Sequence, residues 1–180
     1  KLDLSGRGIR DLTPVKALVN LVELNASSNK ITDVSPLSGL QSLYVLWLNN
    51  NDLDDISPIS TLDNLATLGL DNNSGVDISP LANLKNLVNL SVRNCELTDI
   101  SALTELNVTD LNLSGNNIDD IRPLGTLPKI ERLKLNNNPI TDLSALGNAT
   151  TLLDLYVVYC PVEDFSPVAH VRRVEPYKEE

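Results

Sequence analysis

Two cysteines and one histidine are the most reactive side chains in this sequence of 180 residues. Cys95 and Cys160 lie far apart in the chain, and His170 stands near its C-terminal end. A metal site or a general base would need further ligands or a nucleophile beside them. The sequence has no P-loop, GxGxxG or HExxH motif and no Ser/His/Asp set. We therefore expect a non-enzyme with no catalytic residue, metal ligand, cofactor or small-molecule substrate.

The positions of these residues follow an internal repeat that covers nearly the whole chain. The order Leu43, Leu46, Leu48, Asn51, Leu53, Asp55, Ile56, Ser57, Pro58 recurs 22 residues earlier and, with Gly75 in place of an Ile or Leu, 22 residues later. Eight units begin near residues 1, 21, 43, 65, 87, 108, 130 and 152, and one is a residue short between Leu106 and Val108. This pattern matches the signature of leucine-rich repeats. It predicts an α/β solenoid of about eight 22-residue units.

Each unit is expected to combine a short strand with a short helical turn. The L-x-L segment alternates apolar and polar residues, which is typical of a strand with one buried face. The strands should form a parallel sheet on the concave face, ~34 Å long for eight strands ~4.8 Å apart. Ser57-Pro58 and its equivalents are typical of a helix N-cap followed by Pro in the first turn. Because only about six residues follow before the next strand, we expect 3-10 turns on the convex face.

Asn or Cys follows each strand at a fixed position, where the chain must turn inward. A side-chain amide there can donate to and accept from the backbone of neighbouring units. We predict a buried ladder at Asn29, Asn51, Asn73, Cys95, Asn116, Asn138 and Cys160. The two cysteines lie three units apart, or ~14 Å, which is too far for a disulfide. They are expected to be buried, reduced thiols.

An Asp precedes each expected turn. The row comprises Asp11, Asp33, Asp55, Asp77, Asp99, Asp120, Asp142 and Asp164. A residue that recurs in every unit indicates a structural role, and we expect these carboxylates to accept hydrogen bonds from backbone N–H groups in the turn. Binding of Ca²⁺ along the row is the alternative, although no EF-hand loop accompanies it.

Composition narrows the classes of partner. The formal net charge is −10, which disfavours nucleic acid and anionic membrane surfaces. No apolar run approaches the ~20 residues that a membrane-spanning helix needs. No signal peptide is visible, Met is absent and the chain starts within a repeat, so we expect an excised piece or a processed form of a longer protein.

The repeat phrase N-x-I-x-D-I-S-P-L-x-x-L-x-x-L resembles that of the internalins, surface proteins of Gram-positive bacteria. The resemblance covers residues 1 to about 174. It implies a concave face that binds a host protein and an extracellular or cell-surface location. The same repeat length occurs in a regulatory subunit of protein phosphatase 1, which leaves an intracellular regulatory scaffold as an alternative. A structural spacer without a dedicated ligand is the third possibility.

The outward strand positions are the ones that vary between units, so any partner specificity must lie there. The candidate partner-binding residues are Val45, Trp47, Asn49, Asp71, Arg93, Asp110, Arg132, Lys134, Asp154, Tyr156, Val158 and Tyr159. Trp, Tyr and Arg dominate binding energy at interfaces. Trp47 with Val45 forms one expected anchor, and Tyr156 with Val158 and Tyr159 forms the other. Arg93, Arg132 and Lys134 lie between the anchors and suit an acidic group of a partner.

These observations predict one solenoid domain over residues 1–174, whose last unit is partly a cap, and a charged tail or linker over residues 175–180. The predicted function is a protein-binding module of a bacterial surface or secreted protein. Its expected partner is a protein of a host or neighbouring cell.

Overall fold

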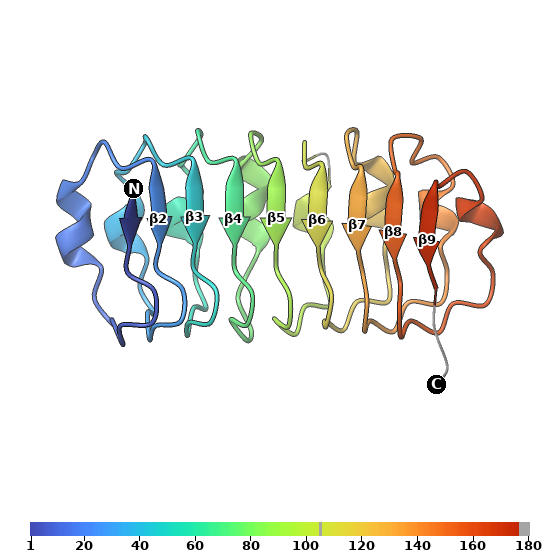
Figure 1. The fold of residues 1–180 in the computed structure, drawn as a ribbon, viewed down its shortest axis with the longest axis horizontal. Helices are drawn as coiled ribbons and strands as arrows, with labels where there is room; N and C mark the ends of the chain where they lie inside the picture. The colour runs from blue at the N-terminus through green and yellow to red at the C-terminus, as the bar shows by residue number, and fades with distance from the viewer. Residues whose placement is uncertain (105, 177–180) are drawn as a thin grey trace.

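Nine short parallel strands form one sheet that runs the length of the molecule in the computed structural model, which describes residues 1–104 and 106–176 (Figure 1). The strand order follows the chain, from β1 to β9. The strands are Leu2–Asp3 (β1), Glu23–Asn25 (β2), Val45–Trp47 (β3), Thr67–Gly69 (β4), Asn89–Ser91 (β5), Asp110–Asn112 (β6), Arg132–Lys134 (β7), Asp154–Tyr156 (β8) and Arg173–Glu175 (β9).

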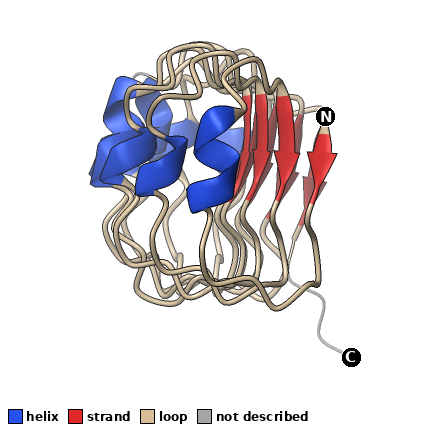
Figure 2. Ribbon diagram, turned by 90° about the vertical axis from the view of Figure 1, so that its left-hand side faces the viewer, coloured by secondary structure: helices blue, strands red, loops and turns tan. Residues whose placement is uncertain are grey.

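Short 3-10 helices lie on the opposite side of the solenoid from the sheet (Figure 2). They are Thr13–Ala17 (η1), Ser35–Leu37 (η2), Ser57–Ile59 (η3), Ser79–Asn83 (η4), Ser101–Leu103 (η5), Arg122–Thr126 (η6), Ser144–Leu146 (η7) and Ser166–Val168 (η8). One strand and one turn per unit confirm the leucine-rich-repeat solenoid and the 3-10 character predicted from the short spacing.

The strand register explains both irregular units. Most neighbouring strands pair residues 22 apart, as in Leu24↔Leu46, whereas β5 and β6 pair residues 21 apart, as in Leu90↔Leu111. The loop before β6 therefore absorbs the missing residue, as expected. The prediction of eight strands was wrong by one, because β9 pairs with β8 at a spacing of 19 residues and keeps only Val174 of the L-x-L pattern. Its last residue, Glu175, is the first of the expected tail, of which 177–180 lie outside the described residues.

The core is a continuous aliphatic column between the sheet and the 3-10 turns. The middle residues of the strands, such as Leu46 and Leu68, are fully buried, and Leu37 and Leu81 meet them from the turns. Each fully buried Leu contributes roughly 1.5–3 kcal/mol by leaving water. Because every unit contributes the same few positions, the solenoid presents its strands at a constant spacing and orientation.

The predicted Asn ladder is confirmed. The side chain of Asn51 donates to the carbonyl oxygens of Ala26 (3.1 Å) and Leu48 (2.9 Å), and its Oδ1 accepts the N–H of Ile31 (3.0 Å). Each ladder amide thus joins its own turn to the preceding unit. The Cys95 thiol replaces the donor by bonding the carbonyl of Leu70 (3.3 Å). Both cysteines are buried and free.

The Asp row caps the 3-10 turns. The N–H of Ser35 donates to Asp33 Oδ1 (2.7 Å), and all eight Asp residues make the equivalent bond to the residue two positions later. The structural role expected for this row is confirmed. The prediction that Ser is the N-cap was wrong: the Ser35 hydroxyl instead donates to Asp33 (2.9 Å), and Ser35 is the first residue of η2. Asp is preferred because it accepts both bonds at once.

Candidate functional site

The exposed side of the sheet consists of three parallel rows of side chains, which we call the strand face. The first row holds the first residue of each strand from β2 to β9, and the second row holds the third residue, starting with Asp3 in β1. The third row lies two residues further along, where the N–H of Ser28 donates to the carbonyl of Asn49 and the same bond recurs from unit to unit. It comprises Ser5, Ser27, Asn49, Asp71, Arg93, Ser114, Asn136 and Val158.

The indole ring of Trp47 reaches over the neighbouring strand in the second row. A Cβ built on Gly69 would come within 2.4 Å of Cε3 of the Trp47 ring. The indole can occupy this place only because its cross-strand partner in the register is Gly. An aromatic ring that covers a strand glycine is held in position by the sheet. Trp47 is therefore a rigid, partly exposed aromatic surface, as a binding anchor requires.

A small hollow lies beside Trp47 on the N-terminal side of the strand face. Its volume is about 140 Å³, and its lining includes Asp3, Glu23, Asn25, Val45 and Trp47. The predicted pairing of Val45 with Trp47 is thus present, since both line the same hollow. Its charged lining residues are two carboxylates, Asp3 and Glu23, and the ammonium group of Lys1, which pairs with Glu23 (2.9 Å).

Tyr156 is held between two cations at the other end of the strand face. Lys134 Nζ lies 5.8 Å from the centroid of its ring, and the Arg173 guanidinium lies 5.3 Å from it. Both distances allow a cation–π attraction. Val158 follows in the third row, and both residues of the second predicted anchor, Tyr156 and Val158, are partly exposed.

Arg132, one of the three cations predicted to suit an acidic group of a partner, is paired with carboxylates of its own chain. Its guanidinium lies 2.6 Å from Asp110 and 3.6 Å from Asp154, and Arg172 also pairs with Asp154 (3.5 Å). The Asp154 side chain is only 11% exposed. The hydrogen bond that Arg132 donates to Asp110 also raises the pKa of Arg132 above its usual value. Arg132, Asp110 and Asp154 thus pair with one another within the first row, and Arg172, which precedes β9, adds a second cation to Asp154.

Asn49 and Asp71 form hydrogen bonds that join neighbouring strands of the sheet. Asn49 Oδ1 accepts the N–H of Asp71 (2.8 Å), and Asp71 Oδ1 accepts the N–H of Arg93 (2.9 Å) and the hydroxyl of Ser91 (2.6 Å). These bonds tie β3 to β4 and β4 to β5 at their carboxyl ends. Both residues were predicted as binding residues, and the structure gives them a structural role at the same position.

Tyr159 is displaced from the second anchor. It has φ +60° and occupies the turn that follows the third row, in the place that Asn50, Asn72 and Asn94 take in earlier units. Residues other than Gly adopt this conformation rarely, and Asn tolerates it best. Tyr159 is 54% exposed, but it lies at the border of the strand face instead of on it.

Comparison with known proteins places this architecture in a family. A model described as Leucine Rich repeats (2 copies) matches residues 19–61 and 106–148. The structure of an internalin (inlF) of Listeria monocytogenes is 32% identical with a TM-score of 0.88, over 96% of this chain and 52% of its own. Internalin C2 (inlC2) of the same species is 32% identical with a TM-score of 0.88, over 96% of this chain and 79% of its own. This chain belongs to the internalin family.

The domain spans about half the length of the internalin inlF structure. A leucine-rich-repeat protein of Leptospira interrogans shares the fold at 21% identity, with a TM-score of 0.78 over 97% of this chain and 54% of its own. The search of curated proteins found no match. Internalins are non-enzymatic binding proteins, and leucine-rich-repeat domains in general bind proteins.

The internalin domain exposes a fourth row that the sequence analysis missed. The residue immediately before a strand is turned outward by a bulge in most units, with the buried Ala66 as an exception. At β3, for example, the carbonyl of Val22 accepts both the N–H of Tyr44 (2.8 Å) and that of Val45 (3.1 Å). Such bulges redirect a side chain. Val22, Tyr44 and Val88 are 47%, 53% and 38% exposed. The signal was an apolar residue directly after the buried Leu, which alternation alone would have placed inside.

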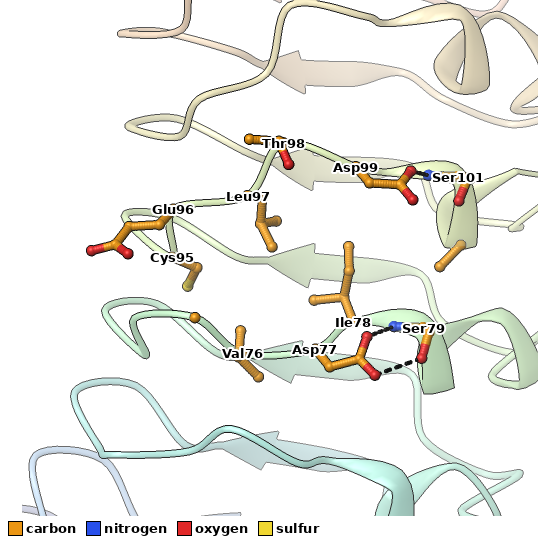
Figure 3. A pocket seen from close by; sticks show the side chains of 12 residues that line it. Val76, Asp77, Ile78, Ser79, Cys95, Glu96, Leu97, Thr98, Asp99 and Ser101 are labelled. Carbon is orange, nitrogen blue, oxygen red and sulfur yellow. Dashed lines mark hydrogen bonds between the residues drawn. The ribbon is translucent and has the colours of Figure 1, made fainter.

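A groove of about 250 Å³ lies on the edge of the internalin domain, between the loops that precede η4 and η5 (Figure 3). It lies where Gly75 stands in place of the larger apolar residue of the other units. Cys95 has no amide oxygen to accept the N–H of Gly75, which donates to the Cys95 carbonyl instead (3.2 Å). Gly75 then adopts φ +74°, and Val76 takes the core place that Gly75 leaves empty. Asp77 and Asp99 point to the turns that they cap.

The groove shows no sign of chemistry. Burial raises the pKa of the Cys95 thiol to about 11, so the reactive thiolate is scarce at neutral pH. No group of three or more His, Cys, Asp or Glu in the described part of the chain could hold a metal ion. His170 is exposed, with Nε2 3.2 Å from the carbonyl of Ala149. Within residues 1–104 and 106–176, no helix has the length and apolar character needed to cross a membrane.

Proposed function

We propose that this domain is the recognition module of a bacterial surface or secreted internalin, and that it binds a protein of a host or neighbouring cell through the strand face. The observation that carries the proposal is the ring of Trp47, the only Trp of the chain, which reaches over Gly69 on the outside of the sheet. An outward Trp has no core to fill. Its fixed position lowers the entropy lost on binding.

The distribution of charge supports the same face. The strand face holds four basic and six acidic residues, a net charge of −2, so −8 of the chain's −10 lies elsewhere. The Asp row contributes eight of these charges on another side of the solenoid. A surface whose net charge is close to zero repels a protein partner less than a strongly acidic surface does. The strand face is therefore better suited to contact a protein than the acidic remainder of the surface.

The proposed location rests on the family. Internalins are surface and secreted proteins, and a host or neighbouring-cell partner requires exposure outside the bacterium. The exposed fourth row widens the apolar surface next to Trp47, since Tyr44 precedes Val45 directly in the chain. Contiguous apolar surface of this kind is typical of interaction sites.

A capture experiment tests the proposal. The domain, its Trp47→Ala/Tyr156→Ala variant and a Leu18→Ala/Val19→Ala control would be presented to cell-surface and cytosolic extracts of host cells. The control removes two exposed apolar side chains, 43% and 56% exposed, that lie outside the strand face. Mass spectrometry would identify captured proteins.

We expect a surface protein captured by the domain and by the control and lost with the double variant. Each anchor should contribute about 2 kcal/mol or more to binding. Equal capture by all three proteins would contradict the proposal, and so would a cytosolic enzyme retained by the double variant, which would favour a regulatory scaffold. Absence of any variant-sensitive partner would favour a spacer.

A further inference from the structure

Charge separates along the strand face. In the second and third rows from β1 to β4 the charged residues are Asp3 and Asp71, both acidic. In the same rows from β5 to β8 they are Arg93 and Lys134, both basic. A patch of charge +2 on a chain of net charge −10 runs against the general trend of its surface.

Arg93 and Lys134 differ from the neighbouring cations in having no carboxylate partner. Arg132 and Arg172 pair with Asp154, and Arg173 pairs with Glu175. Among the described residues no carboxylate lies within 4.0 Å of the Arg93 guanidinium or of Lys134 Nζ. Lys134 is instead held toward the Tyr156 ring. Both charges remain available to a partner.

The side chains between these cations present donors. Asn112 Oδ1 accepts the N–H of Ser114 (3.2 Å), and Asn136 Oδ1 accepts the N–H of Val158 (2.8 Å). With both amide oxygens engaged by the backbone, the amide NH₂ groups of Asn112 and Asn136 are left as donors. Neither NH₂ group donates a hydrogen bond within the described part of the chain. The patch therefore offers one guanidinium group and one ammonium group that are not in an ion pair, together with two amide donors.

We infer that this donor patch, formed by Arg93, Asn112, Lys134 and Asn136, binds an acidic segment of the partner protein. The inference rests on the proposed function and names the chemistry of the segment that lies between the two aromatic anchors. Carboxylate side chains two residues apart on an extended segment would reach successive donors along the rows. Charge-assisted hydrogen bonds of this kind fix register and exclude partners that lack the carboxylates.

Fluorescence anisotropy with defined probes tests the inference. The probe is a fluorescein-labelled peptide of alternating Glu and Ser, compared with a peptide that has Gln in place of Glu. Binding would be measured at low salt, ~20 mM, and at ~150 mM, where surface attraction is screened. The variants are Arg93→Gln/Lys134→Gln and a control, Lys85→Gln/Lys129→Gln. Both remove two positive charges from exposed or partly exposed sites, but Lys85 and Lys129 lie outside the strand face.

We expect the Glu peptide to bind the domain at low salt, about tenfold more weakly to the strand-face variant and within about twofold to the control. The Gln peptide should bind the unaltered domain no more tightly than the Glu peptide binds the strand-face variant. Equal weakening by both variants, or no binding of the Glu peptide to the domain, would overturn the inference. Matching circular dichroism spectra would exclude a folding defect as the cause.

The two proposals fail in different ways. A partner that is lost with Trp47→Ala/Tyr156→Ala but kept by Arg93→Gln/Lys134→Gln would refute the acidic segment and leave the strand face as the binding surface. Peptide binding that follows the charge variants, without any variant-sensitive partner in the extracts, would refute the proposed function and leave the donor patch as an anion-binding surface.

Discussion

On the inner side of the sheet the middle strand residue is Leu in eight strands, from Leu2 to Leu155, and Val174 in β9. On the outer side, the second row runs Asp, Asn, Trp, Gly, Ser, Asn, Lys, Tyr, Glu, and no residue type dominates it. Both sides belong to the same strands and differ by one position in the chain. The inner side is uniform because each unit must fill the same space, whereas the outer side can vary without changing the fold.

The difference between the two sides indicates that the inner side determines stability and the outer side determines recognition. Inner substitutions should lower the free energy of unfolding by several kcal/mol, and outer substitutions should alter binding with small effects on stability. Each unit of a repeat protein contacts mainly its nearest neighbours. A destabilised unit in the middle can therefore also let the two halves of the solenoid unfold independently.

The largest effect is expected from Leu68→Ala in β4. This side chain is fully buried beneath the strand that Trp47 covers, and its truncation leaves a cavity. We expect a loss of about 3 kcal/mol in unfolding free energy, measured by urea denaturation. Trp47→Ala, on the outer side of the neighbouring strand, should cost about 1 kcal/mol or less. Equal losses of unfolding free energy for the two variants would contradict the assignment of stability to the inner side and recognition to the outer side.

Removal of a ladder amide should be next in size. Asn73 is fully buried, donates to the carbonyls of Leu48 and Leu70, and accepts the N–H of Leu53. Asn73→Ala leaves these groups unpaired, with an expected loss of about 2–3 kcal/mol in urea denaturation. Asn73→Cys should lose less, because Cys95 already donates from the same position. A Cys variant as unstable as the Ala variant would contradict the ladder account.

Gly69→Ala should change the outer side of the sheet while leaving the inner side intact. The new Cβ would meet the Trp47 ring at 2.4 Å, so the indole must leave its place while the buried Leu68 stays. We expect a change of about 1 kcal/mol or less in unfolding free energy but a shifted Trp emission maximum and weaker partner binding. Unchanged emission would show that the sheet does not hold the ring. Ala66→Gly, one residue before the strand, is a control for backbone effects.

The smallest effects should come from the Asp row. Hydrogen bonds from the turn lower the pKa of Asp55, Asp99 and Asp142, and that of Asp120 to about 2. Because these pKa values are lower in the folded than in the unfolded chain, where Asp titrates near ~3.9, their contribution is present above pH ~4. It is lost as the pH falls toward ~2. The urea midpoint should decline over this range.

Asp142→Asn provides the matched test of this pH dependence. The amide oxygen can still accept the N–H of Ser144, which Asp142 accepts at 2.7 Å, but it does not titrate. The variant should therefore lose less stability on acidification than the unaltered domain. An identical acid profile would show that the capping carboxylates do not govern it.

The repeated features could be predicted from the sequence because each has many copies. The strands, the 3-10 turns, the Asn ladder and the capping Asp row each recur at a fixed spacing, so one physical reason explains every copy. The features that sequence analysis missed occur where a unit departs from the rule. Strand β9 keeps a single apolar residue, Val174, and the loop at Gly75 differs from the others because Gly has no side chain for the core, so that Val76 fills its place.

The candidate site was only partly predictable, because contacts between side chains of neighbouring units decide which residues are available. Trp47 was identified as exposed, but its support by Gly69 depends on register and ring orientation. Arg132 and Lys134 both occupy outward positions of β7, yet only Arg132 has carboxylates on both neighbouring strands. Tyr44 was missed because alternation does not foresee the bulge.

Site-directed photo-crosslinking tests the central claim most directly. A photoreactive amino acid would replace Asn112, in the second row of the strand face, or Asn83, the exposed last residue of η4 on the opposite side. Both domains would be irradiated with the partner identified by capture. If the strand face binds the partner, the crosslink forms from position 112 and not from position 83. A crosslink from position 83 alone would place the interaction on the 3-10 side and contradict the account.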